Sequence, residues 1–119
     1  MPDQAATFNP GYLEDMSGGD EEFVREIIGT FFETSRDLVE GIRAAAEEGS
    51  AEKGIYVAHT LKGSSRSIGA LCLGDICESL EKLARASDMA GFAAEAPRVQ
   101  EAFVALQAEV AQVYAAKAA

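Results

Sequence analysis

The stretch DEEFVREIIGTFFETSRDLVEGIRAAAEE at residues 20–48 decides the fold, because its apolar residues recur at the spacing of an α-helix. On a helical wheel the apolar residues share one side and most of the charged residues occupy the other. Asp20 suits the N-cap of such a helix, and Gly49 suits its C-terminal cap. The apolar side consists of Val24, Ile27, Ile28, Phe31, Leu38, Val39 and Ile42. The stretch predicts one long amphipathic helix over about 20–48 with a single buried face.

The segments on either side of this stretch carry the same kind of pattern. A short helix is expected over about 10–16, with Asn9 as its N-cap and Pro10 at its first helical position. Longer helices are expected over about 51–68, 71–86 and 89–117, the last with a break or kink near Pro97. The sequence shows no strand-like alternation, internal repeat or linker. It therefore predicts an all-α chain with a single domain over 1–119. The expected architecture is an antiparallel up-down-up-down four-helix bundle with a short additional N-terminal helix.

Composition and charge narrow the possible functions. The net charge of −10, from 20 acidic against 10 basic side chains, argues against nucleic acid and anionic membranes as partners. No apolar run approaches the ~20 residues of a spanning helix, and the N-terminus lacks the pattern of a signal peptide, so a cytoplasmic location is expected. The bundle itself is expected to be a monomer. A single histidine and two cysteines, Cys72 and Cys77, are too few for a zinc site. We expect both cysteines to be buried as small apolar groups, and no metal site.

The segment AHTLKGSSRSIGA at residues 58–70 departs from the pattern of a plain core helix. Its helix buries Val57, Leu61, Ser64 and Ile68 on one side, and the opposite side carries His59, the only histidine of the chain. The same outer face carries Lys62, Gly63 and Arg66, which follow His59 at i+3, i+4 and i+7. It also carries Ile55 and Tyr56, which precede His59 at i−4 and i−3. The helix is thus expected to present an imidazole, two cations, a glycine and two apolar side chains to solvent.

Each of these residues also has an ordinary structural explanation. A surface histidine beside a lysine is commonly only solvated, and Lys62 and Arg66 could be ordinary surface charges. Ile55 and Tyr56 could be covered by the short first helix. Gly63 is harder to explain in this way, because a glycine inside a helix costs about 1 kcal/mol relative to alanine. Its position one turn from His59 favours a site that another molecule must approach closely.

Phosphoryl transfer is the chemistry that suits this arrangement. A neutral imidazole is a good nucleophile near pH 7, and a lysine one turn away can neutralise phosphate oxygens. Because phosphoryl transfer depends mainly on positioning and electrostatics, an acceptor with few catalytic groups suffices when its partner supplies the metal. The chain has no glycine-rich nucleotide motif, so a carrier is indicated and an autonomous kinase is not.

Residues 58–70 closely resemble the signature A-H-x-L-K-G-[SA]-[SA]-x-x-[LIV]-G-A of histidine-containing phosphotransfer (HPt) domains of bacterial phosphorelays. The segments FNPGYL at 8–13, DEEFV at 20–24 and LEKLA at 80–84 resemble other helices of the family. The resemblance implies that His59 accepts a phosphoryl group, normally at Nε2, that Lys62 stabilises the phosphate, and that Gly63 leaves room for the partner. It also implies small residues at Ser64 and Ser65 where helices pack closely.

The partners that this resemblance implies are receiver domains of response regulators and hybrid histidine kinases, which would contribute the aspartate and Mg²⁺, so that the chain itself needs no cofactor. Ile55, Tyr56 and Arg66 are candidate partner-binding residues. Two alternatives remain open: a helical adaptor that docks receivers without being phosphorylated, and the phosphoacceptor domain of a larger histidine kinase. The intact set of His59, Lys62 and Gly63 speaks against the adaptor, and Thr60 stands where kinase dimerisation helices usually carry an acidic residue.

Overall fold

The computed structural model describes residues 8–118, and side chains through residue 114; the described part is helical and contains no strand. The predicted all-α fold class is confirmed. In chain order the helices are α1 (Gly11–Ser17), α2 (Glu21–Glu48), α3 (Ala51–Ser67), α4 (Leu71–Arg85), α5 (Met89–Glu95) and α6 (Pro97–Ala118).

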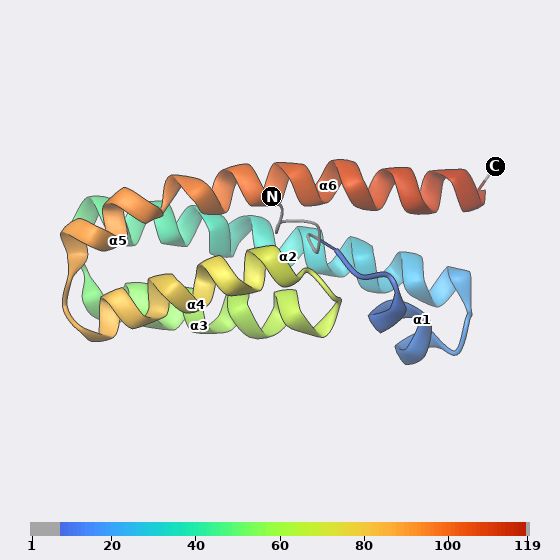
Figure 1. Ribbon diagram of the computed structural model, residues 1–119, viewed down its shortest axis with the longest axis horizontal. Helices are drawn as coiled ribbons and strands as arrows, with labels where there is room; N and C mark the ends of the chain where they lie inside the picture. Colours follow the sequence, from blue (N-terminus) through green and yellow to red (C-terminus); the bar gives the residue numbers. More distant parts are fainter. Residues whose placement is uncertain (1–7, 119) are drawn as a thin grey trace.

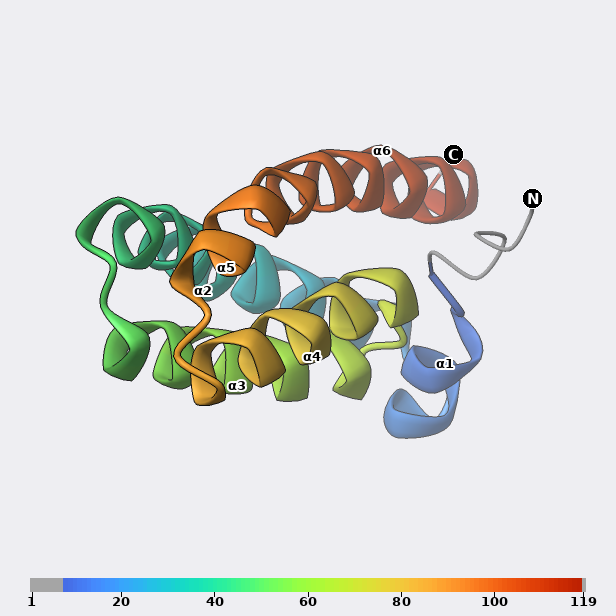
Figure 2. The ribbon, with the colours of Figure 1, turned by 60° about the vertical axis from the view of Figure 1, so that its left-hand side comes forward.

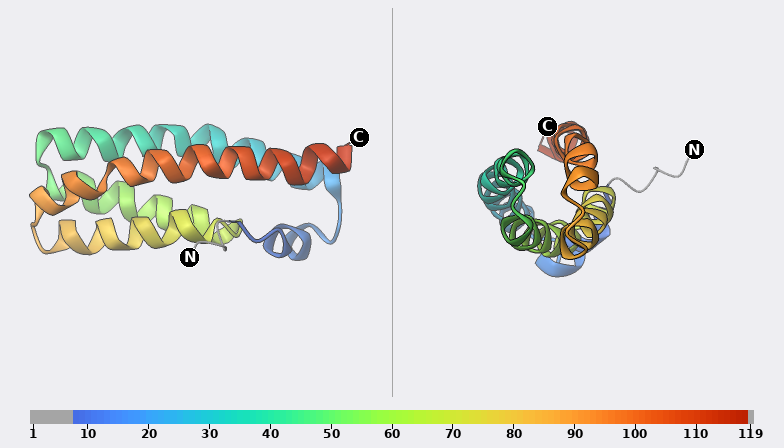
Figure 3. Two further views of the ribbon diagram at one scale, coloured as in Figure 1. Left: turned by 45° about the horizontal axis from the view of Figure 1, so that its top comes forward. Right: turned by 90° about the vertical axis from the view of Figure 1, so that its left-hand side faces the viewer.

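The long helices run in alternating directions along one axis (Figure 1). Helices α3 and α4 form a closely packed pair, and α2 and α6 extend beyond them (Figures 1 and 3). Helix α1 occupies the space beyond the end of the α3–α4 pair and contacts α2, while α5 leads from the α4 side of the molecule to α6 (Figure 2). The end of α3 that carries Ile55 therefore lies far from α1.

Local chemistry fixes where the helices begin and end. The Asp20 carboxylate accepts hydrogen bonds from the backbone N–H groups of Glu22 and Phe23, at 3.0 and 3.2 Å, and so caps α2. Gly49 ends α2 in the left-handed conformation, with φ of 66°. Helix α1 begins one residue later than expected. Pro10 therefore lies at its N-cap, and the Asn9 side chain accepts from the Gly11 N–H at 2.9 Å.

The expected break near Pro97 divides the last segment into two helices, α5 and α6. Proline lacks an N–H group and its ring crowds the preceding turn, so the helix cannot continue unchanged through residue 97. Ala96 lies between the two helices, and Pro97 occupies the first position of α6, where its missing N–H group costs nothing.

The core is built from the apolar stripes of the helices. From α2 it includes Val24, Phe31, Val39 and Ile42, whereas Ile27, Ile28 and Leu38 are only partly buried against it. Cys77 is fully buried, but Cys72 is half-buried, so the expectation for the cysteines holds for Cys77 alone. Burying each large apolar side chain contributes roughly 1.5–3 kcal/mol. None of the helices in the described part of the chain combines the length and the apolar character that a membrane span requires.

Candidate functional site

His59 lies on the outer face of α3, with 64% of its side chain exposed. Its neighbours in sequence, Ala58 and Leu61, are fully buried, and they fix the face of α3 that is turned inward. The ring is held from one side only: Nδ1 lies 3.1 Å from Oε2 of Glu81, which comes from α4. An exposed imidazole is thus anchored by a carboxylate of the neighbouring helix.

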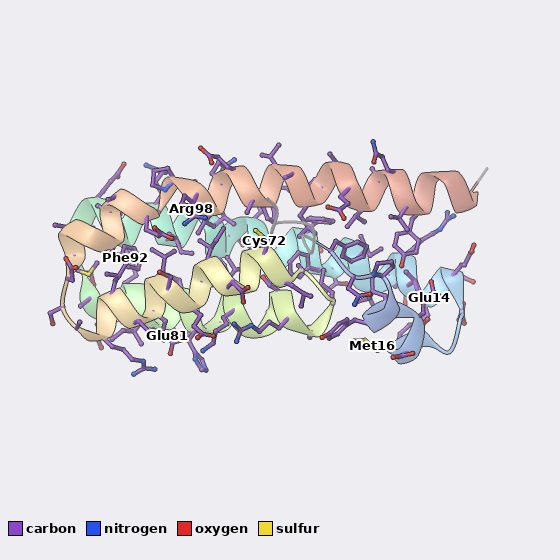
Figure 4. The ribbon with its side chains drawn as sticks, in the orientation of Figure 1. Glu14, Met16, Cys72, Glu81, Phe92 and Arg98 are labelled. Atoms are coloured by element: carbon purple, nitrogen blue, oxygen red, sulfur yellow. The ribbon has the colours of Figure 1, made fainter. Side chains whose placement is uncertain are left out.

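Glu81 is a buried carboxylate, with only 8% of its side chain exposed. The Arg85 guanidinium donates to Oε2 through Nε at 3.0 Å and through a terminal nitrogen at 2.7 Å. The Lys62 ammonium forms an ion pair with Oε1 at 2.8 Å. Burial by itself raises the pKa of Glu81, but the interactions with Lys62, Arg85 and His59 outweigh burial and lower the pKa to about 2. Glu81 is therefore ionised at neutral pH. Figure 4 labels Glu81 on the side of the molecule formed by α3 and α4.

The charge of Glu81 selects the tautomer of His59. An ionised carboxylate only accepts hydrogen bonds, so the Nδ1 that contacts it must carry a hydrogen and donate. In the neutral ring the second nitrogen, Nε2, is then unprotonated and keeps its lone pair. The site therefore holds an imidazole with a nucleophilic nitrogen at Nε2.

Lys62 and His59 meet at the same carboxylate. Lys62 follows His59 by nearly one turn, and its side chain, which is 22% exposed, extends to Glu81 as the imidazole does. The shared carboxylate holds a positive charge and the imidazole on the same group. The structure thus brings together His59 and Lys62 from the sequence prediction.

Gly63 is exposed on α3, and a Cβ atom added to it would meet no atom within 4 Å beyond its chain neighbours and the backbone of its own helix. Two other helical glycines differ: a Cβ at Gly54 would lie 3.0 Å from the Phe92 ring, and one at Gly41 would lie 2.9 Å from Val57, whereas Gly29 on α2 is as open as Gly63. Packing within the chain explains Gly54 and Gly41. It does not explain Gly63.

The other predicted contact residues have different surroundings. Tyr56 is 67% exposed, and Ile55 is half-buried against the core. Because α1 lies at the other end of α3, it covers neither of them (Figure 1). Arg66 is already engaged within the chain: its guanidinium contacts Asp75 at 3.1 Å and Glu78 at 2.6 Å.

Arg66 lies across α4 because Gly74 leaves room for it. A Cβ at Gly74 would come within 2.8 Å of Arg66 Cγ, so this glycine provides the surface on which the arginine side chain rests. A terminal nitrogen of Arg66 binds both carboxylates of α4, which makes Arg66 a bridge between α3 and α4. Its proposed contact with a partner would have to form in addition to these ion pairs.

Sequence reasoning missed Glu81 and Arg85. One signal was available: the buried residues Gly74, Cys77, Glu81 and Ala84 of α4 are spaced as one helical stripe, so Glu81 is a carboxylate on an otherwise apolar face. Among the described side chains, no three His, Cys, Asp or Glu residues gather in a way that could hold a metal ion. The expectation that a partner brings Mg²⁺ stays a prediction.

Comparison with known proteins decides the family. The family model of the Hpt domain matches residues 26–116, which is most of the chain and includes the whole of α3 and α4. The chain belongs to the Hpt domain family. The histidine-containing phosphotransfer protein B (HptB) from Pseudomonas aeruginosa PAO1 has the same fold. Its crystal structure matches with a TM-score of 0.84 and 24% sequence identity over 91% of this chain and 94% of HptB. A comparison with curated proteins finds no match.

Proposed function

We propose that this Hpt domain accepts a phosphoryl group on Nε2 of His59 and relays it between receiver-domain aspartates of a hybrid histidine kinase and a response regulator. The observation that carries the proposal is the anchored imidazole. Its Nδ1–H donates to the buried Glu81 carboxylate, and Nε2 is left as the nucleophile on an exposed ring. Family membership supports the same chemistry.

The proposed transfer balances without a proton donor. The Nε2 lone pair attacks the phosphorus of an aspartyl phosphate, the N–P bond forms, and the O–P bond breaks, so that the aspartate leaves as a carboxylate. Nδ1 keeps its hydrogen, and the ring therefore becomes positively charged as the bond forms. The Glu81 carboxylate, 3.1 Å from Nδ1, stabilises this charge. The reverse reaction uses the same groups in the opposite order.

Lys62 contributes electrostatics to the transferring group. Its ammonium is held next to the ring by Glu81, and phosphate oxygens that arrive at Nε2 offer it a second anionic partner. In this proposal the receiver domain supplies the acidic site and Mg²⁺. The Hpt domain then needs no nucleotide site or cofactor of its own and acts as a phosphocarrier, in the cytoplasm and as a monomer.

The two flanks of His59 differ in how much room they leave for a receiver. Toward α4, the surface is filled by the ion pairs of Arg66 with Asp75 and Glu78. On the other flank, Gly63 adds no side chain and Tyr56 is exposed. We propose that the receiver approaches over Gly63, with Tyr56 and the exposed part of Ile55 as further contacts.

The experiment that tests the function is phosphotransfer to His59→Gln from a radiolabelled, phosphorylated receiver domain. We expect no acceptance by the variant, and a free energy of unfolding within about 0.5 kcal/mol of wild type, because the side chain is exposed. Thr60→Gln, next to the histidine on the same helix, is the control and should accept normally. Acid-labile phosphate on His59→Gln would contradict the proposal, since the chain has no second histidine.

A further inference from the structure

A second feature of the surface lies away from His59, between α2 and the junction of α5 and α6. It is a groove of about 650 Å³. Its apolar lining includes Val39 and Ala46 from α2 and Ala93, Ala96 and Pro97 from the α5–α6 junction. Viewed along the bundle axis, α2 and α6 stand apart on the side opposite to the α3–α4 pair (Figure 3). The groove is thus separate from the site at His59, which is carried by α3 and α4.

Short side chains on both walls leave part of this groove open. Pro97 breaks the helix at Ala96, and around this break alanines face α2, where Ala46 is also small. Alanine side chains cannot span the distance between two helices that do not pack closely, so the space stays open. Val39 and Phe92 are buried nearby, which means that the groove ends on the core of the domain.

Acidic side chains surround the apolar lining. Glu40, Glu47 and Glu101 lie on the walls with one cation, Arg43, which gives a formal charge of −2. Arg43 forms ion pairs with both Glu40 and Glu47, so its charge is already neutralised within the chain. Glu101 forms no ion pair or hydrogen bond with another of the described residues. The net charge of the whole chain, −10, adds to the negative potential.

We infer that this groove binds a basic amphipathic α-helix of a partner protein. An apolar groove between helices accepts a further helix that presents apolar side chains at i, i+3, i+4 and i+7. Lysine and arginine side chains of that partner helix, next to its apolar residues, would meet Glu101 on α6 and Glu40 and Glu47 on α2. Charge complementarity also argues against other occupants: a second copy of this acidic chain, an anionic membrane and nucleic acid would each bring negative charge to a negative surface.

Because the groove and His59 lie on different helix pairs, the two surfaces can be occupied at the same time. A helix bound in the groove would hold a partner near the domain without blocking phosphoryl transfer. Binding at both surfaces raises the effective concentration of the tethered partner at His59. This inference does not depend on the proposed function, because the groove would bind a helix whether or not His59 is phosphorylated.

The test uses a synthetic peptide of about 18 residues, which spans ~27 Å as a helix. It has Leu and Ala along one face and Lys on the other, and a matched peptide carries Glu in place of Lys. Binding to the whole protein is measured by fluorescence anisotropy and mapped by NMR chemical shifts. We expect only the Lys peptide to bind, with the largest shifts at Ala46, Ala93 and Ala96.

Two pairs of variants separate the groove from general electrostatic attraction. Ala93→Phe fills the groove and should weaken binding about tenfold, while Ala94→Phe, on an exposed position of α5 outside the lining, should not. Glu101→Lys should weaken binding severalfold, and Glu33→Lys, an exposed acid elsewhere on the bundle, should have little effect. Phosphoryl acceptance by Ala93→Phe should equal that of wild type.

Four results would overturn the inference: no binding of the Lys peptide, equal binding of the Glu peptide, shifts that map outside the groove, or equal effects of Ala93→Phe and Ala94→Phe. Self-association through this face, seen in sedimentation as a dimer that Ala93→Phe dissociates, would also overturn it. Since acceptance at His59 is measured on the same proteins, failure of the groove is distinguishable from failure of the carrier function.

Discussion

Replacing Gly63 tests whether the surface beside His59 is kept open for a partner. The structure gives the expected effect on stability. A Cβ at residue 63 meets no atom within 4 Å, so Gly63→Ala gains the full helix propensity of alanine, about 1 kcal/mol, without a steric cost. For a domain of this size such a gain raises the midpoint of thermal unfolding by roughly 4 °C. Gly63→Gln should gain nearly as much, because its side chain points into solvent.

Gly54 on the same helix provides a matched control. Gly54→Ala has the same gain in propensity, but its Cβ would lie 3.0 and 3.2 Å from atoms of the Phe92 ring, and Phe92 is fully buried. Overpacking of this kind costs typically about 1–3 kcal/mol. We therefore expect Gly54→Ala to be no more stable than wild type, and opposite signs for the two glycines would show that packing requires one and not the other.

The functional measurement is single-turnover phosphotransfer from a phosphorylated receiver domain. A glutamine at residue 63 stands one turn from His59, on the flank where we place the receiver. In-line transfer requires reacting atoms about 3–3.5 Å apart, and a displacement of ~1 Å costs up to ~100-fold in rate. We expect Gly63→Gln to unfold at a higher temperature than wild type and to transfer at least about tenfold more slowly. A variant that is more stable and transfers at the wild-type rate would refute the reasoning.

Three further variants test the remaining groups of the site. Lys62→Ala should slow transfer in both directions and keep the fold, and rates equal to wild type would make Lys62 an ordinary surface lysine. Glu81→Gln should slow transfer because the charge opposite Nδ1 is lost. Because the pKa of Glu81 falls from an ordinary value near 4.5 to about 2 on folding, its stabilising effect is complete above pH 4.5 and is lost toward pH 2. In urea unfolding, the wild type should have a larger free energy of unfolding than Glu81→Gln above pH 4.5, and this difference should shrink between pH 4.5 and pH 2. A difference that stays constant over this pH interval would contradict the assignment. Arg66→Ala should lose up to about 1 kcal/mol of stability from its exposed ion pairs and affect transfer less than Lys62→Ala does; a larger effect on transfer would place Arg66 in the partner interface.

The helices follow from local sequence because their signals are local. The stripe of α2, the Asp20 cap and the break at Pro97 each depend on residues within a few positions of one another, and the structure has α2 at Glu21–Glu48 and the break at Ala96. The position of α1 is different. Its short pattern predicts a helix, but only the packing of the longer helices leaves the space beyond the α3–α4 pair that it occupies (Figure 2).

The residues of the site that lie on one helix could be predicted from the sequence, whereas the residue from the neighbouring helix could not. His59, Lys62 and Gly63 lie within five residues of one helix, so the helical period alone places them on one face. Glu81 lies 22 residues after His59, and its role depends on how α4 is aligned against α3. A carboxylate in an apolar stripe is a visible signal in the sequence, and Arg85 follows it at i+4, but its contacts with His59 and Lys62 cannot be identified until the two helices are paired.

The alignment of α3 and α4 is set at the turn between them. This turn requires Gly69, whereas the packing of the chain does not require Gly63. Gly69 has φ of 86°, and a Cβ there would lie 2.3 Å from the Asn9 carbonyl oxygen. The Asn9 N–H also donates a hydrogen bond to the Gly69 carbonyl oxygen at 2.8 Å. No other residue fits this turn without moving the N-terminal segment. Shifting α4 by one residue would rotate Glu81 by about 100° away from His59 and Lys62 on α3, and Glu81 would keep only its ion pair with Arg85 within α4. The turn at Gly69 therefore positions the carboxylate that orients the imidazole. Gly63, which the fold does not require, is left to be explained by what approaches the imidazole from outside.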